Sequence, residues 1–322
     1  MKKLSIIIPV YNAQDHIRTC LDSISRQLRK EYEIILIDDG SRDSSLDILK
    51  EYERQYPGSV RVIAKENEGV AKTRNLGIRE AAGEYLCFID NDDFVDKNYF
   101  ENFLTAIEQD KCDIVIGGYR RVEGDKIRFQ VKPVASAWYK FMVAAPWAKI
   151  FRRSFLINNG IEFLDYGLGE DVYFSLVAYA KTRKIKVVDY IGYNWYFNQK
   201  SVSNTSQRGF SKELDPLYLL EKIYNEVGSG EILYSYYYIR YGIWYLLFSG
   251  RQSTKEKFLS EYKKLFLWYE KRNVPCKFPI FSRAVLAEKL ATRCMVGCFL
   301  IFHKFKLVKL FAKFYCIGEN SE

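Results

Sequence analysis

The sequence predicts an α/β fold in which a mostly parallel sheet is flanked by helices and followed by a helical carboxyl-terminal region. Over the first 120 residues, short apolar runs alternate with amphipathic segments, which is typical of βαβ units. From residue 211 onward the apolar pattern has the helical period. The 322 residues are enough for two domains. We expect one domain over residues 1–205 and a helical one over residues 206–322.

The expected elements follow from these patterns in chain order. The first domain should contain strands at residues 4–10, 33–37, 60–64, 85–89 and 114–116, with helices between them at 14–28, 44–56, 70–82 and 97–109. A later helix is expected at 170–181, with strands at 185–189 and 192–196. The second domain should contain helices at 213–227, 231–249, 254–272 and 281–315. The polar stretch 198–209 is the expected linker.

Composition excludes several classes of protein. A hydrophobic fraction of 48% with 28% charged residues excludes a disordered or collagen-like chain. Seven scattered cysteines indicate free thiols in a reducing compartment, because a disulfide scaffold is short and cysteine-dense. The first apolar run is too short for a signal peptide, and no stretch reaches the roughly 18 apolar residues of a spanning helix. We therefore expect a cytoplasmic protein.

The net charge of +9 is concentrated at the end of the chain, where residues 251–322 hold 15 Lys and Arg against 6 Asp and Glu. Residues 295–317 interleave lysines with phenylalanines and leucines at helical spacing. This pattern suits a helix lying on the cytoplasmic face of an anionic membrane. It equally suits a core helix, or one that forms a homodimer, with a solvated lysine side. A nucleic-acid partner is not expected, because phosphate-binding tails contain fewer apolar residues.

The ends of the predicted strands carry the first candidate site. The turn after the first strand has no glycine, which disfavours a dinucleotide-binding dehydrogenase. The second strand ends in Asp38 and Asp39, whose carboxylates can accept hydrogen bonds from a base or a ribose. The alternative is that Asp38 or Ser41 caps the next turn and helix. Ligands of parallel sheets lie beyond the carboxyl ends of the strands, which is the position of these residues.

A second acidic cluster follows the fourth strand, at Asp90, Asn91, Asp92 and Asp93. Three carboxylates in four residues repel one another unless a cation neutralises them, and oxygen-rich sites suit Mg²⁺ or Mn²⁺. The alternative is a solvated turn that caps the next helix. Arg74 is expected either to reach this turn and a bound ligand, or to form a structural ion pair with the turn.

Glu170 and Asp171 form a third acidic site, after two loop glycines and at the start of a predicted helix. A helix N-terminus favours the ionised carboxylate, so the pair suits both a catalytic base and simple capping. The two histidines, His16 and His303, lack neighbouring Asp or Ser patterns. Catalysis by a histidine base or a histidine-bound zinc ion is therefore not expected.

Taken together, these motifs resemble the family-2 inverting glycosyltransferases of the GT-A fold, in particular the bacterial non-processive members that build capsular, wall or lipid-linked polysaccharides. The matching segments, in the order found in that family, are SIIIPVYN at 5–12, IDDGSRD at 37–43, NEGVAKTRNLG at 67–77, GEYLCFIDNDD at 83–93, WAKIFRRSFL at 147–156 and GEDV at 169–172. The resemblance covers roughly residues 1–205. It does not explain the helical remainder.

The resemblance implies a role for each matching residue. Asp92 would bind a divalent cation, Mn²⁺ or Mg²⁺, that bridges the donor diphosphate, and Asp171 would be the general base with Glu170 beside it. Asp39 and Asp38 would contact uracil, and Asp90 the ribose or the water shell of the ion. The implied donor-binding residues are Pro9, Tyr11, Asp38, Asp39, Asn67, Lys72, Arg74, Asp90 and Asn91. Asn91 and Lys72 replace residues that are usually small in this family.

Residues 193–203 (YNWYFNQKSVS) resemble the loop that closes over the donor in such enzymes. Candidate acceptor or loop residues are Trp147, Lys149, Trp195 and Ser201. The Gln-x-x-Arg-Trp motif of processive enzymes is absent, which favours single-sugar transfer. The expected activity is metal-dependent transfer of a hexosyl or N-acetylhexosaminyl group, with inversion, from a UDP-sugar to a glycan or lipid-linked acceptor in polysaccharide biosynthesis. The alternative is a catalytically silent, sugar-nucleotide-binding scaffold subunit.

Overall fold

The computed structural model describes residues 2–167, 169–198, 210, 215–228, 231–276 and 282–318. The chain forms two compact units. The first contains Met1–Ala135 and Val143–Asn198, and the second contains Ser136–Met142 and Gln199–Glu322. The short segment Ser136–Met142 therefore belongs to the helical unit although it precedes the last part of the first unit in the chain. Most of the expected linker, residues 199–209, lies outside the described residues.

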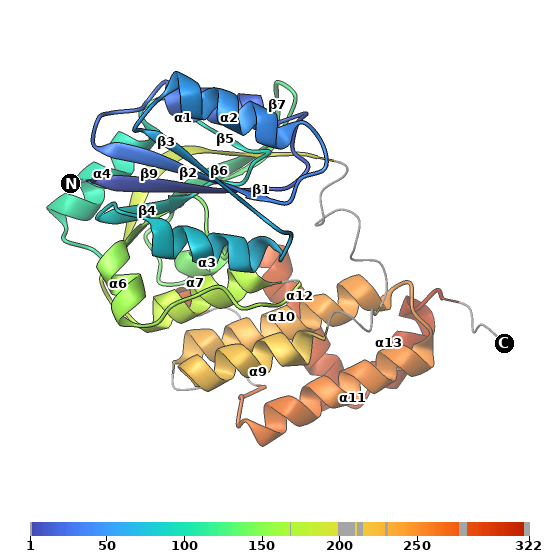
Figure 1. The fold of residues 1–322 in the computed structure, drawn as a ribbon. Helices are drawn as coiled ribbons and strands as arrows, with labels where there is room; N and C mark the ends of the chain where they lie inside the picture. Colours follow the sequence, from blue (N-terminus) through green and yellow to red (C-terminus); the bar gives the residue numbers. More distant parts are fainter. Residues whose placement is uncertain are drawn as a thin grey trace. The chain divides into compact units, whose positions relative to one another are not determined.

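The first half of the sheet is parallel and has the strand order β3-β2-β1-β4. Its elements are β1 (Leu4–Val10), α1 (Ile17–Ser25), β2 (Tyr32–Asp39), α2 (Ser45–Gln55), β3 (Val60–Lys65), α3 (Val70–Glu80) and β4 (Tyr85–Phe88). Figure 1 shows α1 and α2 on one face of the sheet and α3 on the other. Right-handed crossovers place these helices on opposite faces. The chain moves outward from β1 to β3 through α1 and α2, and then returns past β1 to β4 through α3. The carboxyl ends of β1 and β4 consequently flank a switch point, where such sheets bind ligands.

The second half of the sheet is mixed and continues in the order β4-β8-β6-β9-β5, with β7 paired to β6. Its elements are β5 (Phe94–Val95), α4 (Tyr99–Gln109), β6 (Ile114–Glu123), β7 (Lys126–Val131), β8 (Lys149–Arg152), α6 (Arg153–Asn158), α7 (Glu170–Ala180) and β9 (Ile185–Tyr196). The two short strands expected at 185–196 are one strand, β9, whose pairing with β6 shifts register around Gly118. The sequence did not predict β5, β7 or β8. Strands β5 and β8 are short, and β7 is mostly exposed.

An aromatic cluster fixes the start of α7 beside the end of β4. Phe88 makes edge contacts with Phe163 and Phe174 at centroid distances of 5.3 and 5.6 Å, and Phe163 stacks on Phe174 at 4.0 Å. The Asn75 amide on α3 bonds both backbone groups of Phe163, at 2.9 and 2.7 Å. These buried contacts join α3, β4 and α7.

The second unit is helical. It contains α5 (Tyr139–Met142), α9 (Pro216–Val227), α10 (Ile232–Gly250), α11 (Lys255–Lys271), the 3₁₀ turn η1 (Arg283–Val285), α12 (Leu290–Lys304) and α13 (Val308–Tyr315). The single helix expected at 281–315 is wrong, because the backbone turns at Lys306, which has a positive φ of 59°. Within the described ranges, no helix combines the length and the apolarity needed to cross a membrane.

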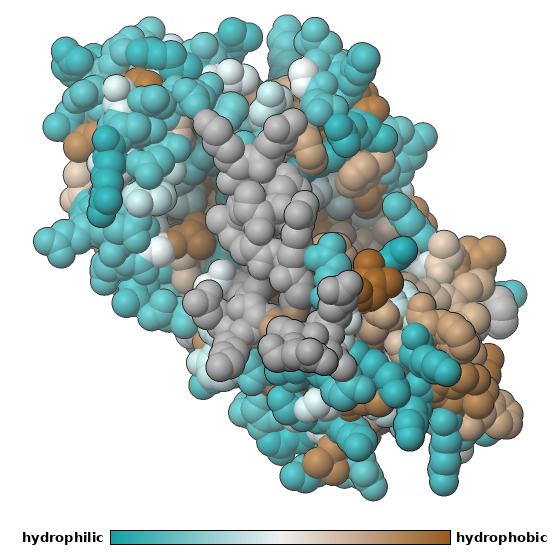
Figure 2. All heavy atoms as spheres, turned by 90° about the vertical axis from the view of Figure 1, so that its right-hand side faces the viewer, coloured by the Kyte–Doolittle hydropathy of each residue, from teal (hydrophilic) through white to brown (hydrophobic). Residues whose placement is uncertain are grey.

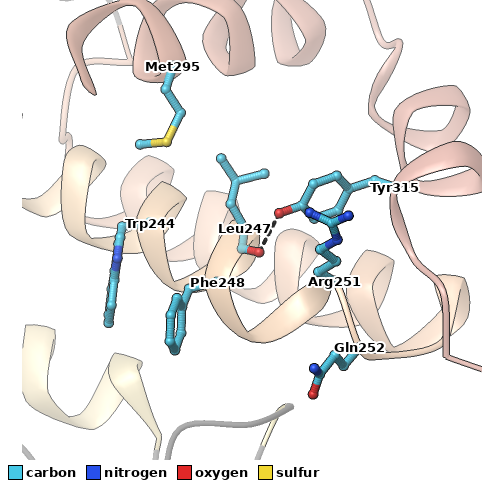
Figure 3. Close-up of a pocket in the computed structure, with 7 residues that line it drawn as sticks. All are labelled: Trp244, Leu247, Phe248, Arg251, Gln252, Met295 and Tyr315. Atoms are coloured by element: carbon cyan, nitrogen blue, oxygen red, sulfur yellow. Dashed lines mark hydrogen bonds between the residues drawn. The ribbon is translucent and has the colours of Figure 1, made fainter. Parts of the chain in front are cut away.

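Helices α10, α12 and α13 surround a cavity of about 480 Å³ (Figure 3). Its lining is mainly apolar, with Arg251 and Gln252 at one end, and the other lining residues are Trp244, Leu247, Phe248, Met295 and Tyr315. The Tyr315 hydroxyl donates a 2.5 Å hydrogen bond to the carbonyl of Leu247. This bond attaches α13 to α10.

Candidate active site

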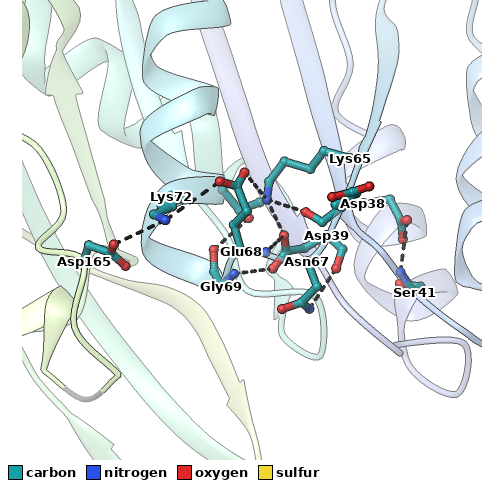
Figure 4. A network of polar contacts seen from close by, with 11 residues as sticks. Asp38, Asp39, Ser41, Lys65, Asn67, Glu68, Gly69, Lys72 and Asp165 are labelled. Atoms are coloured by element: carbon teal, nitrogen blue, oxygen red, sulfur yellow. Dashed lines mark hydrogen bonds and ion pairs between the residues drawn. The ribbon is translucent and has the colours of Figure 1, made fainter.

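Asp39, at the end of β2, is the centre of a polar network that holds the loop after β3 (Figure 4). Its carboxylate forms an ion pair with Lys65 and accepts hydrogen bonds from the backbone N–H groups of Glu68 and Gly69, both at 2.9 Å. The Asn67 amide donates to the Asp39 carbonyl at 2.9 Å. Burial alone would raise the pKa of Asp39, but these hydrogen bonds outweigh it and lower the pKa. Asp39 is therefore a fixed negative charge.

The Asp39 carboxylate keeps some capacity to bind a ligand. Oδ1 accepts hydrogen bonds from Lys65 and Glu68, and Oδ2 accepts one from Gly69. Since each carboxylate oxygen can accept two, Oδ2 retains one acceptor position. Asp38 is also buried, and its Oδ2 accepts from the Ser41 N–H at 3.2 Å. That contact is the turn-capping arrangement considered as the alternative for Asp38.

The turn after β2 packs closely on the loop after β3. Gly40 has a positive φ of 73°, and a Cβ at this position would lie 2.9 Å from the backbone nitrogen of Asn67. Only glycine allows both the conformation and the close approach. The turn after β1 is joined to the same region, because the backbone N–H of Asn12 donates to the Ser41 hydroxyl at 3.0 Å. Nearby Tyr11 has an exposed side chain.

Arg74 joins the second and third acidic sites. Its guanidinium donates to Asp90 Oδ1 at 2.6 Å and to Glu170 Oε1 at 3.0 Å, and it lies 5.2 Å from the centre of the Phe163 ring. Burial alone would lower the pKa of Arg74, but the two carboxylates outweigh it and raise the pKa. The structure therefore brings together Arg74, Asp90 and Glu170, which lie up to 96 residues apart in the sequence.

The remaining residues of the acidic turn have different environments. Asp93 is fully buried and accepts hydrogen bonds from the Tyr193 hydroxyl at 2.5 Å and from the Tyr196 N–H at 2.8 Å, which attach the turn to β9. Asp92 is half-buried and accepts one long hydrogen bond, 3.4 Å, from the Asn198 amide. Burial raises the pKa of Asp92, and the neighbouring Asp90 adds to the shift. The Asn91 amide donates to the Pro9 carbonyl at 2.9 Å, so β1 and the acidic turn are joined.

Asp92 is chemically suited to a divalent cation. Mg²⁺ is usually bound through one or two carboxylates, with waters and substrate phosphates completing its coordination. Among the residues that the structure describes, no group of three or more His, Cys, Asp or Glu side chains is arranged to hold a metal ion. Asp92 is a single carboxylate with one long hydrogen bond, and burial disfavours its ionised form. Such a carboxylate fits a cation that takes its remaining ligands from a phosphate.

Glu170 and Asp171 begin α7, after Gly169 in a left-handed conformation. Asp171 is half-buried, and its Oδ1 accepts a 2.7 Å hydrogen bond from the Val172 N–H. Burial raises the pKa of Asp171 to about 7, Glu170 adds to the shift, and Arg74 opposes it. Desolvation therefore outweighs the helix dipole, which was expected to keep Asp171 ionised, and the carboxylate is only partly ionised at neutral pH.

Other candidate residues have structural partners. Lys72 is half-exposed and pairs with Asp165 at 3.4 Å and Glu68 at 3.8 Å. Lys149 is fully buried, and its ammonium donates to the carbonyls of Ala145 and Trp147. Burial lowers the pKa of Lys149 well below its ordinary value, although Asp171 opposes the shift.

The aromatic candidates pack with residues that were not among the candidate site residues. Trp147 stacks on Tyr193 at 4.7 Å with an angle of 5° between the rings, and the Arg121 guanidinium lies 3.5 Å from the centre of the Trp195 ring. Trp147 is largely buried. Ser201 lies outside the described residues.

The sequence analysis did not select Lys65 as a site residue, although its position in the third strand could have indicated it. It ends the third strand, and in the parallel register it lies opposite Asp39. Arg121 carried no such signal. Tyr193 begins the segment 193–203 that resembles a donor-closing loop, but its contact with Asp93 depends on the pairing of β6 with β9.

Known proteins share this chain's motifs and fold. Residues 5–204 match the profile of glycosyl transferase family 2. An uncharacterized glycosyltransferase of Escherichia coli, YibD, is 29% identical over 64% of this chain and 65% of its own length. A poly(ribitol-phosphate) beta-glucosyltransferase of Bacillus spizizenii is 35% identical over 61% of this chain and 32% of its own length. The matched region thus spans about a third to two thirds of these relatives.

Among solved structures, residues 1–349 of Staphylococcus aureus TarS in complex with UDP align with a TM-score of 0.61. The identity is 20%, and the alignment covers 96% of this chain and 89% of that one. This likeness confirms the predicted GT-A fold, with its helical carboxyl-terminal region. The profile match covers more than half of the chain and confirms the family that the motifs indicated. The chain belongs to glycosyl transferase family 2.

Proposed function

We propose that the protein transfers one sugar, with inversion, from a nucleotide-diphospho-sugar to a hydroxyl group of a glycan or lipid-linked acceptor in bacterial polysaccharide biosynthesis. The observation that carries this proposal is the bridge from Arg74 to Asp90 and Glu170, which unites the acidic turn with the start of α7. In this proposal residues 1–205 form the catalytic domain. Relatives named as poly(ribitol-phosphate) glycosyltransferases support the acceptor class.

The donor would bind at the carboxyl ends of β1, β2 and β4. Asp39 has one free acceptor position for a base N–H, and the exposed Tyr11 lies on the neighbouring turn. UDP is the ligand in the TarS complex, which favours a uridine nucleotide. Asp92 would hold a divalent cation, Mn²⁺ or Mg²⁺, which when bound offsets negative charge on the departing diphosphate. Lys72, if released from Asp165, would offer a second positive charge.

Asp171 is the proposed general base. Glu170 is occupied by Arg74, whereas among the described residues no cationic side chain hydrogen-bonds to Asp171. A pKa of about 7 lets the carboxylate accept a proton at neutral pH and release it afterwards. Asp171 would take the proton of the acceptor hydroxyl as that oxygen attacks the anomeric carbon, on the side opposite the departing diphosphate. Displacement in one step gives inversion.

A donor screen tests the proposed function. The purified chain is incubated with UDP-, GDP- and dTDP-sugars, with and without glycan acceptors, and release of nucleoside diphosphate is measured in Mn²⁺, in Mg²⁺ and with a chelator. We expect nucleoside diphosphate to be released from a UDP-sugar, and this release should need the cation. Asp92→Asn should abolish the release. Asp125→Asn, a matched change at an exposed turn, should keep it. A chain that binds UDP yet releases no diphosphate from any donor would instead be a silent scaffold.

A further inference from the structure

Helix α13 packs within the helical unit through its inner side. Val308 and Ala312 are buried, Phe311 stacks on Tyr315 at 4.8 Å, and Tyr315 is hydrogen-bonded to α10. Phe311 also contacts Phe299 of α12 at 5.9 Å. These residues follow the spacing of one helical face, so the inner face accounts for the packing of α13 within the helical unit.

The opposite side of α13 carries a second apolar strip that this packing does not use. Leu310 and Phe314 lie one turn apart, and their residues are 55% and 77% exposed. Further exposed apolar residues come just before and just after the helix, and we define the outer strip as Phe305, Leu307, Leu310, Phe314 and Ile317. Figure 2 shows hydrophobic side chains gathered at the lower right of that view, among hydrophilic ones. Packing of α13 into the helical unit explains the apolar residues of its inner face. It does not explain the apolar residues of the outer strip.

Lysines border the outer strip, and residues 289–318 contain no Asp or Glu. The bordering residues are Lys304, Lys306, Lys309 and Lys313, all exposed. Two of their ammonium groups lie beside aromatic rings of the strip, with Lys304 at 5.7 Å from Phe305 and Lys313 at 5.9 Å from Phe314. Apolar rings bordered by ammonium groups match the boundary between the acyl chains and the anionic headgroups of a bilayer.

We propose that the outer strip binds the surface of an anionic phospholipid membrane, with Leu310 and Phe314 inserted and the lysines at the headgroups. Charge decides between this occupant and a second copy of the chain. A two-fold contact would place the strip against itself and bring Lys309 and Lys313 close to the same residues of the partner copy, with no acidic residue of the segment to compensate. An anionic membrane supplies that compensation. This inference goes beyond the proposed transfer reaction and does not depend on it.

Vesicle flotation of the full chain tests the apolar part of the proposal. We expect the protein to float with phosphatidylglycerol/phosphatidylcholine vesicles and to stay unbound with phosphatidylcholine alone. The double variant Leu310→Ser/Phe314→Ser should lose most of this binding. The matched control Ile127→Ser/Phe129→Ser removes two apolar residues of β7, which are 57% and 42% exposed, and should bind normally. Equal binding by both double variants would overturn the proposal.

The charged part is tested with Lys309→Gln/Lys313→Gln. Each lysine near an anionic surface strengthens binding about fivefold, so the double variant should bind roughly 30-fold more weakly. Lys50→Gln/Lys97→Gln, two exposed lysines of the first unit, should bind as the wild type does. Sedimentation without lipid gives the competing outcome. Self-association that Leu310→Ser/Phe314→Ser abolishes, together with no vesicle binding, would replace the membrane with a second copy.

Discussion

Replacing Arg74 with methionine should destabilise the first unit by about 3 kcal/mol. The guanidinium is almost fully buried, and the side chains of its partners, Asp90 and Glu170, are 29% and 13% exposed. Breaking a buried ion pair costs about 3–5 kcal/mol, because the remaining carboxylate is left without a partner. Asp90 is exposed enough to be partly rehydrated, which places the estimate at the lower end. Methionine keeps most of the side-chain volume beside Phe163, so little of the loss should come from packing.

Urea unfolding followed by tryptophan fluorescence measures this loss, and Arg61→Met is the matched control. Arg61 pairs with Glu80 at 2.7 Å on the surface, where an ion pair contributes less than about 1 kcal/mol. Arg74→Lys should fall between the two, because one ammonium cannot reach both carboxylates as the guanidinium fork does. If Arg74→Met and Arg61→Met cost the same, the buried bridge does not hold the acidic turn and α7 together.

Three further predictions concern titration and hydrogen bonding. Since the pKa of Asp171 is raised to about 7, kcat/KM should rise with pH through that value, and a profile flat from pH 5 to 9 would contradict the base assignment. Burial lowers the pKa of Lys149 below its ordinary 10.5, so the unfolded chain binds more protons than the folded one. Thermal stability should therefore rise with pH towards 10 in the wild type. In Lys149→Met this rise should be absent. Tyr193→Phe removes the hydroxyl that donates to buried Asp93 and should cost about 1–3 kcal/mol in urea unfolding, whereas Tyr190→Phe, at a more exposed hydrogen bond, should cost less.

The parallel half of the fold was predictable because its strands are continuous apolar runs. All of β1 is buried, so Leu4–Val10 has no polar alternation to confuse it with another element. The mixed half was not predictable, because β8 has four residues and β5 has two, and neither has a periodic pattern. The break before α13 was missed for another reason. Lys306 adopts a left-handed conformation without glycine, so the sequence carries no signal for it.

The acidic sites were predictable as residues but not as environments. Asp90, Asp92, Glu170 and Asp171 follow a strand or begin a helix, which the sequence shows directly. Their pKa values depend on burial by segments far away in the chain, and this is why the helix-dipole argument gave the wrong direction for Asp171.

Asp171→Asn tests the central claim most directly. The substitution keeps the shape of the side chain while removing its ability to accept a proton. With the donor found in the screen, calorimetry should give a donor affinity close to that of the wild type, while the transfer rate falls by roughly two to four orders of magnitude. Asp189→Asn, at an exposed position on β9, is the matched control and should leave both quantities unchanged. Normal turnover by Asp171→Asn would contradict the account, and loss of donor binding would place Asp171 in the nucleotide site instead.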